Sequence, residues 1–508
     1  MPSSSPQEAK RGADELIRLK LVDGCHALEY APEGPFVWTK ARFRLRNPGT
    51  PSMILTLGYL GAQGRLSLSV DAQRIDETAL REGWQRCTLT VPPGKDWIDL
   101  EVTPVIAVDG EPRELGIMLR TMTPLDDETI HAALRARTDN ALLNDIEFRQ
   151  GSSILASHPQ HLRITVATRC NIPETSQPCA YCFWDWAKEM EKGAPDFRLD
   201  SLDDLRGFYT DAETINDCSI AEPIMNKHFA QVAARIDGDY KHFSFTTNGQ
   251  LLGARQRREL LGKNVDVYVS IDAATAEGFR RYRNDRFDRI ISNLRAFCLE
   301  KREHDNLPKV IVSLLAMRSN RDEIDAYLAL MKDVGVDLVK LRALTLDDNV
   351  APVVINNGYR FDYAAEVLDV NELARVGEAA RISADEHDIP LYIEWEQFEA
   401  ERAGQPRCGE PWKTLYVLNR GVMPCCYATD PIAKWEDQGD RTVDQFLTDT
   451  FNSPAYQDIR RELAAGRLSS YCRNTPSCPV LKRQATAAGC SKQAASGAAA
   501  LASAHESG

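Results

Sequence analysis

The chain has 508 residues, of which 43% are hydrophobic and 27% are charged, and its formal net charge is −13. This length is too great for one hydrophobic core, so about two to four domains are expected. The negative charge argues against nucleic acid or an anionic membrane surface as a partner. The polar N-terminus lacks the apolar segment of a signal peptide, and no apolar run is long enough for a membrane helix. These features predict a cytoplasmic protein.

The N-terminal part of the chain predicts a leader and an antiparallel β-domain. Residues 1–30 are expected to form a polar leader with a short helix. From 31 to 125, apolar and polar residues alternate in short runs, separated by turn signals such as Ala62-Gln63-Gly64. The runs are Ala41–Leu45, Met53–Leu57, Leu66–Val70, Cys87–Val91, Ile98–Val102 and Gly116–Arg120. This pattern indicates a β-sandwich-like domain. Residues 126–158 are expected to form a helical connector.

From Leu162 the pattern changes to strands that alternate with helices. The expected strands are Leu162–Thr168, Asp217–Ile220, His242–Thr246, Val265–Ile271, Lys309–Ala316, Leu338–Ala343 and Leu391–Trp395. The expected helices are Lys227–Ile236, Phe287–Lys301, Asp322–Val334 and Asn371–Glu386. Such alternation predicts an α/β fold, a partial (β/α)6-type parallel barrel over 159–400. A small cysteine-rich extension over 401–484 and a low-complexity tail over 485–508 are expected to follow.

Three cysteines, Cys170, Cys179 and Cys182, come directly after the first expected strand of the barrel. In a reducing compartment such a group indicates metal ligation or catalysis before disulfides. A [4Fe–4S] cluster normally takes four cysteine ligands, so three would leave one iron open for a substrate or cofactor. The spacing alone also permits a zinc knuckle or a redox pair. Barrel enzymes place their chemistry at the carboxyl ends of the strands, which is where this loop lies.

The segments Thr168-Arg169-Cys170-Asn171 and Cys179-Ala180-Tyr181-Cys182 resemble the signature of radical S-adenosylmethionine enzymes. In that family, Cys-x3-Cys-x-aromatic-Cys follows the first strand, whereas eight residues separate the first two cysteines here. The resemblance implies that Cys170, Cys179 and Cys182 hold a [4Fe–4S] cluster whose fourth iron binds S-adenosylmethionine. It also implies that Tyr181 packs near the adenine.

Later strand ends extend this resemblance. Ile220-Ala221-Glu222-Pro223 stands where the family has Gly-Gly-Glu-Pro, and Thr246-Thr247-Asn248-Gly249 is similar to its Thr-Asn-Gly turn. Ser270, at the end of the next strand, and Arg283 match positions near the cofactor's carboxylate and ribose. The resemblance therefore implies cofactor contacts for Glu222, Asn248, Ser270 and Arg283.

The C-terminal cysteines resemble the SPASM extension, which binds auxiliary [4Fe–4S] clusters in radical enzymes. The cysteines concerned are Cys408, Cys425, Cys426, Cys472 and Cys478. The resemblance implies at least one auxiliary cluster, and the sequence does not decide between Cys425 and Cys426. A structural zinc site is the alternative. Cys490, in the tail, is expected to be a free thiol.

The resemblance implies an oxidoreductase-type radical enzyme. Its reduced cluster cleaves S-adenosylmethionine to a 5′-deoxyadenosyl radical, which removes hydrogen from a substrate carbon. The electron donor would be a flavodoxin, a ferredoxin or a reductase. Glu394 and Glu396 are candidate proton acceptors, and alternation along a strand would put both on one face.

The substrate is the least constrained part of the prediction. The segment Arg113–Arg120 resembles β-domains attached to bacterial polysaccharide enzymes, which favours net oxidation of a carbohydrate or small polar metabolite. The alternative is a maturase that oxidises or cross-links a ribosomal peptide or protein side chain. A non-enzymatic alternative is an iron–sulfur scaffold or electron-transfer protein.

Overall fold

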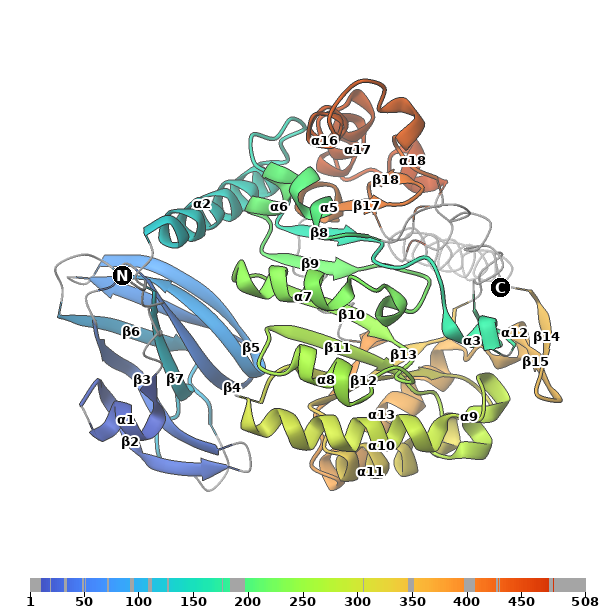
Figure 1. Ribbon diagram of the computed structural model, residues 1–508, viewed down its shortest axis with the longest axis horizontal. Helices are drawn as coiled ribbons and strands as arrows, with labels where there is room; N and C mark the ends of the chain where they lie inside the picture. The colour runs from blue at the N-terminus through green and yellow to red at the C-terminus, as the bar shows by residue number, and fades with distance from the viewer. Residues whose placement is uncertain are drawn as a thin grey trace, which may run out of the picture.

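The computed structural model contains two large β-sheets joined by the long helix α2 (Glu128–Gln150) (Figure 1). It describes residues 11–18, 20–31, 34–47, 50, 52–70, 73–91, 96–107, 112–125, 128–175, 177–182, 197–304, 306–345, 351–396, 407–425, 428, 430–474 and 478. Cys426 and Cys490 therefore lie outside the described residues. Among the described helices, none is both long and apolar enough to cross a membrane.

The N-terminal sheet is antiparallel and closes on itself. Its strands are β1 (Arg11–Gly12), β2 (Val22–Ala31), β3 (Gly34–Arg46), β4 (Ser52–Val70), β5 (Gln73–Thr90), β6 (Trp97–Thr103) and β7 (Met118–Leu125). The short helix α1 (Ala13–Arg18) lies between β1 and β2 in the chain. β7 pairs with β3, β3 with β6, β6 with β4, and β4 again with β7. Four strands thus form a ring around one apolar core, in place of the two facing sheets of the expected sandwich. The ring depends on pairings between distant segments, which local alternation does not encode.

The expected turn at Ala62-Gln63-Gly64 lies inside the long strand β4. A shift of register between Tyr59 and Gln63 absorbs the extra residues, as a β-bulge does. A Cβ atom at Gly64 would come within 2.5 Å of Tyr59 Cζ. The glycine is therefore explained by the close approach of a tyrosine ring, and the two expected strands on either side of it are one strand.

The second sheet has nine strands, most of them parallel and adjacent in chain order. They are β8 (His161–Ile164), β9 (Thr214–Asp217), β10 (His242–Thr247), β11 (Val265–Ser270), β12 (Lys309–Ala316), β13 (Leu338–Ala343) and β16 (Leu391–Ile393), with β17 (Thr414–Leu418) and β18 (Gly421–Met423) beyond β8. The strand–helix alternation predicted from Leu162 onward is confirmed. The pairing of β17 with β8 was not predicted, and it brings residues from the cysteine-rich extension into this sheet.

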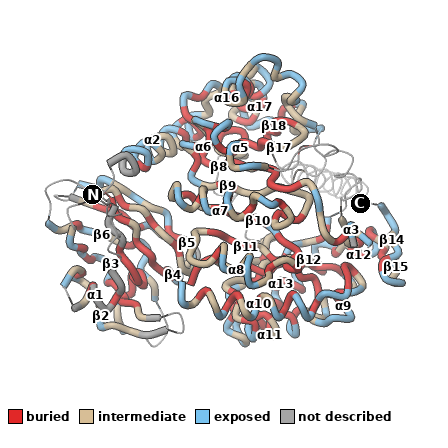
Figure 2. The backbone as a smooth tube through the Cα atoms, viewed as in Figure 1, coloured by how far each residue is buried: buried red, intermediate tan, exposed pale blue. Residues whose placement is uncertain are grey.

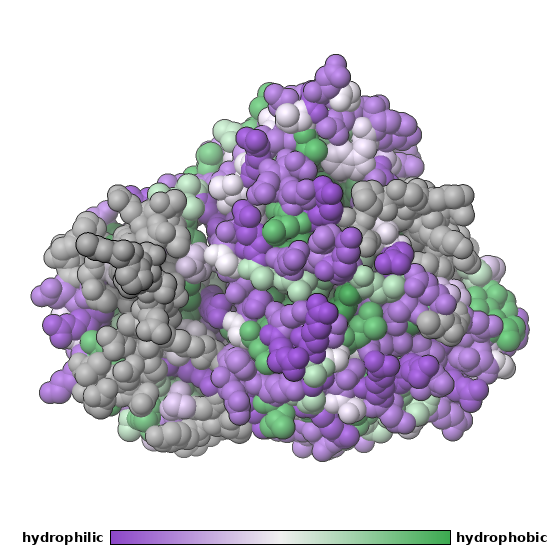
Figure 3. All heavy atoms as spheres, in the orientation of Figure 1, coloured by the Kyte–Doolittle hydropathy of each residue, from purple (hydrophilic) through white to green (hydrophobic). Residues whose placement is uncertain are grey.

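Amphipathic helices cover one face of the parallel sheet. The main ones are α7 (Phe229–Gly238), α8 (Ala254–Leu260), α9 (Ala276–Tyr282), α10 (Phe287–Glu300), α11 (Ile324–Val334) and α13 (Val370–Glu386). Their apolar sides join one core with the strands, and the helix surfaces seen in Figure 3 are mostly hydrophilic. The remaining elements are α3 (Asn171–Thr175), α5 (Asp200–Asp204), α6 (Arg206–Asp211), β14 (Val353–Asn356), β15 (Tyr359–Asp362), α12 (Tyr363–Glu366), α15 (Glu410–Lys413), α16 (Val443–Phe451), α17 (Pro454–Ala464) and α18 (Ser470–Arg473).

The two faces of the parallel sheet have different chemistry. Toward the helices, alternate strand residues are buried and apolar: Leu162, Ile215, Phe243, Val267, Val312 and Leu341. Buried stretches along the parallel strands are coloured red in Figure 2. The intervening residues are mainly polar, and most are only partly buried: Arg163, Asn216, Ser244, Tyr268, Ser313, Lys340 and Tyr392. Parallel sheets are ordinarily apolar and covered on both faces. A partly open polar face is therefore a candidate ligand surface.

Several contacts link the N-terminal sheet to the domain of the parallel sheet, and two of them show where the domains meet. Lys309, the first residue of β12, donates from Nζ to the backbone oxygen of Glu82 at 2.7 Å. Arg86 pairs with Asp237, with Nη1 at 3.2 Å from Oδ1. Both contacts lie at the amino ends of the parallel strands or in the turns before them, on the side away from the cysteine loop.

Arg460 joins several C-terminal elements from a fully buried position in α17. Its guanidinium donates to the backbone oxygens of Pro411 at 2.9 Å and Ser153 at 3.1 Å and to Asn452 Oδ1 at 3.2 Å, and it lies 4.4 Å from the ring centre of Phe451. Replacing Arg460 by Met should lower the free energy of unfolding by about 3 kcal/mol, because three charge-assisted hydrogen bonds are lost. Urea denaturation measures this. The exposed neighbour Arg461, changed in the same way, should alter stability by less than about 0.5 kcal/mol; equal effects would contradict the prediction.

Candidate functional site

The three-cysteine loop follows β8, and α3 of this loop lies at the carboxyl ends of the parallel strands (Figure 1). Cys170 directly precedes α3. The Cys182 N–H donates to the Cys179 carbonyl at 3.0 Å, which closes a tight turn, and the Ala180 N–H donates to the Tyr282 carbonyl at 2.8 Å. These backbone contacts hold the Cys179–Cys182 turn next to the end of α9.

Glu222 lies after β9 and joins the ends of neighbouring strands. The carboxylate is almost completely buried and accepts from Thr247 Oγ1 and from the Asn248 N–H, each at 2.7 Å. Its own N–H donates to the Arg169 carbonyl at 2.9 Å. Burial raises the pKa of Glu222 to about 7, although these hydrogen bonds favour the charged form. The structure thus brings Glu222 and Asn248 together, as the strand-end resemblance implies.

Asn248 connects this group to the cysteine loop. Its Nδ2 donates to Asn171 Oδ1 at 2.8 Å and lies 4.0 Å from Cys170 Sγ. Asn171 in turn donates to Gln250 Oε1 at 3.1 Å. The first cysteine therefore has an amide donor beside its sulfur, at the carboxyl end of β10.

Arg283 forms a second group on the other side of the loop. The buried guanidinium donates from Nε to Asp272 Oδ2 at 2.8 Å and from Nη1 to Cys179 Sγ at 3.7 Å. It also lies 5.6 Å from the ring centre of Tyr181, whose hydroxyl donates to Asp272. Burial raises the pKa of Tyr181 well above its ordinary value, so the phenol stays protonated. We call Cys179, Tyr181, Asp272 and Arg283 the Arg283 group.

Asp272 is a site residue that was not predicted. It is buried directly beyond β11 and its Oδ1 also accepts the Leu315 N–H at 2.9 Å. An acidic residue directly after an apolar strand was the available signal. Ser270, which was predicted, is the last residue of β11 and pairs in register with Ser313. It lies on the polar face, and within the described part of the chain no side-chain contact connects it to the Arg283 group.

The thiols have the environment of buried metal ligands. Burial raises the pKa of Cys170 to about 12 and also raises that of Cys179, so both are protonated until a metal displaces the proton. The Asn248 amide and the Arg283 guanidinium beside the two sulfurs would stabilise thiolates bound to iron. The donor set therefore fits an iron–sulfur cluster. Within the described residues, no three His, Cys, Asp or Glu side chains converge enough to hold a metal ion as they stand.

The C-terminal cysteines lie on elements that pack around α17. Cys408 comes shortly before α15, Cys472 lies in α18, and α17 contacts both helices. Burial raises the pKa of Cys472, and the nearby Cys478 thiol acts in the same direction. The ring of Tyr471 packs against the small apolar cluster that Cys425 also contacts. The sequence could not choose between Cys425 and Cys426, and the structure describes only Cys425.

The two candidate proton acceptors after β16 point to opposite faces, which corrects the expectation that they share one. β16 ends at Ile393 and a helical turn begins at Glu394, so strand alternation does not continue. Glu394 pairs with Arg342 at 2.8 Å and with Lys340 at 3.4 Å on the polar face. Glu396 instead pairs with Arg381 of α13, on the helix-covered face.

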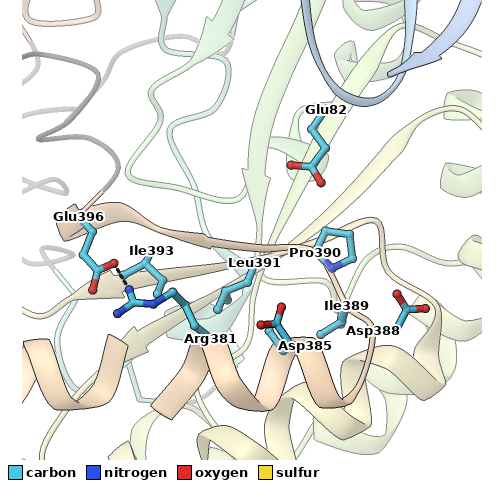
Figure 4. Close-up of a pocket in the computed structure, with 10 residues that line it drawn as sticks. Glu82, Arg381, Asp385, Asp388, Ile389, Pro390, Leu391, Ile393 and Glu396 are labelled. Carbon is cyan, nitrogen blue, oxygen red and sulfur yellow. Dashed lines mark hydrogen bonds and ion pairs between the residues drawn. The ribbon is translucent and has the colours of Figure 1, made fainter. Parts of the chain in front are cut away.

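A cavity of about 430 Å³ lies on that helix-covered side, between α13, β16 and Glu82 of β5. Figure 4 shows Leu391 and Ile393 of β16 lining it together with Arg381 and Glu396. These β16 residues alternate with Tyr392, which belongs to the polar face. The cavity is therefore separated from the cysteine loop and the polar face by the sheet itself.

Comparison with known proteins gives similar folds without a family match. No family model matches the chain, and no curated protein matches it. The chain is similar in fold to SuiB. The crystal structure of Streptococcus suis SuiB has 14% sequence identity and a TM-score of 0.46, with 64% of this chain and 72% of that chain covered. A structure of anSMEcpe with bound AdoMet has 14% identity and a TM-score of 0.41, with 62% and 95% covered. SuiB has also been solved with S-adenosylmethionine and with the precursor peptide SuiA.

Proposed function

We propose that the protein is a radical S-adenosylmethionine enzyme whose chemistry takes place at the carboxyl ends of β8–β11. One observation carries the proposal. The predicted residues Glu222 and Asn248 lie in one set of contacts that reaches the Cys170 sulfur, and Arg283 lies in a second set that reaches the Cys179 sulfur. Residues separated by more than a hundred positions in the chain thus meet beside the three-cysteine loop.

Cys170, Cys179 and Cys182 would hold a [4Fe–4S] cluster, with Tyr181, Glu222, Asn248, Ser270 and Arg283 around the cofactor. When bound, the cluster and S-adenosylmethionine supply a reducing electron and a 5′-deoxyadenosyl radical that abstracts hydrogen from a substrate carbon. The protein's contribution is to orient these groups and exclude water. Asn248 and Arg283 place donors at the sulfurs, and Asp272 holds the Arg283 guanidinium in position. An external flavodoxin, ferredoxin or reductase would supply the electron.

We further propose that residues 159–400 form a catalytic partial barrel and that residues 401–484 form an auxiliary-cluster extension. Cys408, either Cys425 or Cys426, Cys472 and Cys478 would be the ligands of one auxiliary [4Fe–4S] cluster. The arrangement of α15, α17 and α18 supports this, because it brings the segments carrying Cys408 and Cys472 to one helix.

Replacing both Cys408 and Cys472 by Ala should lower bound iron by about half, because two cubes become one. Iron is measured in protein purified and reconstituted without oxygen. A Cys25→Ala, Cys298→Ala double variant is the matched control and should keep its full iron content. Unchanged iron in the Cys408/Cys472 variant would assign these thiols another role, such as a zinc site.

We propose that the substrate is a peptide or a protein side chain. SuiB has been solved with the precursor peptide SuiA, and anSMEcpe has also been solved with AdoMet and the Cp18Cys peptide. Nothing in the comparisons supports the carbohydrate oxidation that the N-terminal segment favoured in the sequence. A gene for a short precursor peptide beside this gene would support a peptide substrate. Neighbouring glycosyltransferase genes would instead favour a carbohydrate substrate.

The decisive experiment is reductive cleavage of S-adenosylmethionine. The reconstituted protein, with dithionite and without oxygen, should form 5′-deoxyadenosine and methionine. The control is the same protein after an iron chelator has removed its metal. Product no greater than in this control would contradict the proposed function and favour an iron–sulfur scaffold or electron-transfer protein.

A further inference from the structure

Lys340 lies on the partly open polar face, one strand in from the β16 edge of the sheet. It lies on β13, and its Nζ is 5.2 Å from the ring centre of Tyr392 on β16 and 5.9 Å from that of Tyr268 on β11. Both distances are within the range of cation–π attraction. To approach Tyr268 on β11, the ammonium group must extend from β13 toward β12, which lies between the two strands. A lysine that only linked β13 to its neighbour β16 would not need this position.

Two positively charged side chains, Lys340 and Arg342, share the Glu394 carboxylate next to these rings. Glu394 Oε1 lies 3.4 Å from Lys340 Nζ, and Glu394 Oε2 lies 2.8 Å from Arg342 Nε. Burial acts to raise the pKa of Glu394, but Arg342 and Lys340 outweigh it and the pKa is lowered. The side chains of Lys340 and Arg342 are 24% and 54% exposed, so this pair of residues is not sealed within the protein.

The register of the sheet places Lys340 near the proposed cofactor site. Ser270 pairs with Ser313, Ser313 with Lys340, and Lys340 with Tyr392, so these residues form one row across the strands. Neighbouring strands are about 4.8 Å apart, which puts the Lys340 backbone about 10 Å from that of Ser270. A molecule anchored at Lys340 would thus lie beside the end of β11, where the Arg283 group begins.

We propose that Lys340, with Arg342 beside it, binds a carboxylate of the substrate on the polar face. This inference rests on the proposed function and specifies its substrate class: a molecule with an anionic group a short distance from the carbon that loses hydrogen. An ammonium fixed by two rings and a carboxylate is pre-organised for such a group, which lowers the entropic cost of binding. The carboxylate could belong to an acidic peptide side chain or to a sugar acid.

The test compares charged and neutral probes of the same shape. Full-length reconstituted protein is titrated, by calorimetry or ligand-observed NMR, with N-acetyl-L-glutamate α-amide, N-acetyl-L-glutamine α-amide and D-glucuronate. The glutamate probe should bind about tenfold more tightly than the glutamine probe, which is the value of one charge-assisted contact. Lys340→Met should remove this preference, and Lys340→Arg should retain most of it.

Lys332→Met is the matched control, because Lys332 lies on the outer helix α11 and pairs with Asp388 at 2.8 Å. This variant should keep the tenfold preference. Tighter binding of glucuronate than of the glutamate probe would still support the carboxylate site and identify a sugar acid as the source. Equal binding of the charged and neutral probes, or a preference that survives in Lys340→Met, would overturn the proposal.

Two further measurements separate this inference from the function on which it rests. Probe binding is repeated with saturating S-adenosylmethionine, and loss of the carboxylate preference there would overturn the proposal by assigning Lys340 to the cofactor. S-adenosylmethionine cleavage is measured in the same preparations. If S-adenosylmethionine is cleaved but the charged probe is not preferred, only the proposed carboxylate site is contradicted. If the charged probe is preferred but S-adenosylmethionine is not cleaved, only the proposed function is contradicted.

Discussion

Alanine in place of Cys170, Cys179 or Cys182 should abolish reductive cleavage of S-adenosylmethionine, with a fall in rate of at least about a hundredfold. Each replacement removes a thiol from a donor set of three, and two thiols cannot hold a cube that leaves a single iron open. The three single variants should therefore behave alike, and each should also lose the absorbance and iron of one cluster. The rate of 5′-deoxyadenosine formation and the iron content are measured on the same samples.

Cys298→Ala provides the control for this prediction. Cys298 is a buried cysteine of α10, on the helix-covered side of the sheet, and packs there as a small apolar residue. Its variant should keep wild-type cleavage and iron, apart from a small loss of stability. Residual cleavage in one loop variant alone would show that the cysteine concerned is not a ligand. This outcome would be most informative at Cys170, because eight residues separate it from Cys179.

The parallel sheet could be predicted from the sequence because its signals are local. β12 and β13 have the predicted bounds: β12 is a mainly apolar run, and β13 alternates buried apolar residues with Lys340 and Arg342. β9 lies three residues earlier than expected, at Thr214–Asp217. β9 is only four residues long, and Ile215 is its single buried residue, between Thr214 and Asn216. The apolar pattern that predicts a strand is therefore weak here.

Non-local pairings set the limit of prediction. The closed ring of the N-terminal sheet joins β7 to β4, and β17 joins β8 across most of the parallel domain. Local alternation specifies which residues of a strand point inward but not which strand lies beside it. The end of β16 shows the same limit at a single residue: the strand ends at Ile393, and Glu394 and Glu396 then lie on opposite faces.

Candidate site residues that belong to a sequence motif could be predicted. Residues that matter only because they contact a motif residue could not. Glu222, Asn248 and Arg283 were expected and meet beside the cysteine loop. Asp272 and Lys340 were not, because their significance comes from the partners that the fold gives them. Asp272 is placed by its contacts with Arg283 and Tyr181, and Lys340 by two rings from strands on either side of it.

Replacing Arg283 by Met should lower the rate of S-adenosylmethionine cleavage by about a hundredfold while leaving most of the iron bound. The reason is positional. The guanidinium fixes Asp272, lies against the Tyr181 ring and donates to Cys179 Sγ, so its removal frees three groups at once. A displacement of about 1 Å at a reacting centre can cost this much in rate. Cleavage and iron content are measured together, because a purely structural defect would lower both in proportion.

Arg281→Met is the matched control, since Arg281 is two residues away and pairs with Glu277 on the protein surface at 3.2 Å. It should leave cleavage and stability unchanged within error. Arg283→Met should also lower the free energy of unfolding by about 3–5 kcal/mol, because Asp272 would remain buried without its cation. An Arg283→Met, Asp272→Asn double variant should recover much of that stability, because the unpaired charge is gone, but it should not recover cleavage. Recovery of both stability and cleavage in the double variant would mean that Arg283 serves only to neutralise Asp272. Wild-type cleavage in the single Arg283→Met variant would show that Arg283 has no role in cleavage.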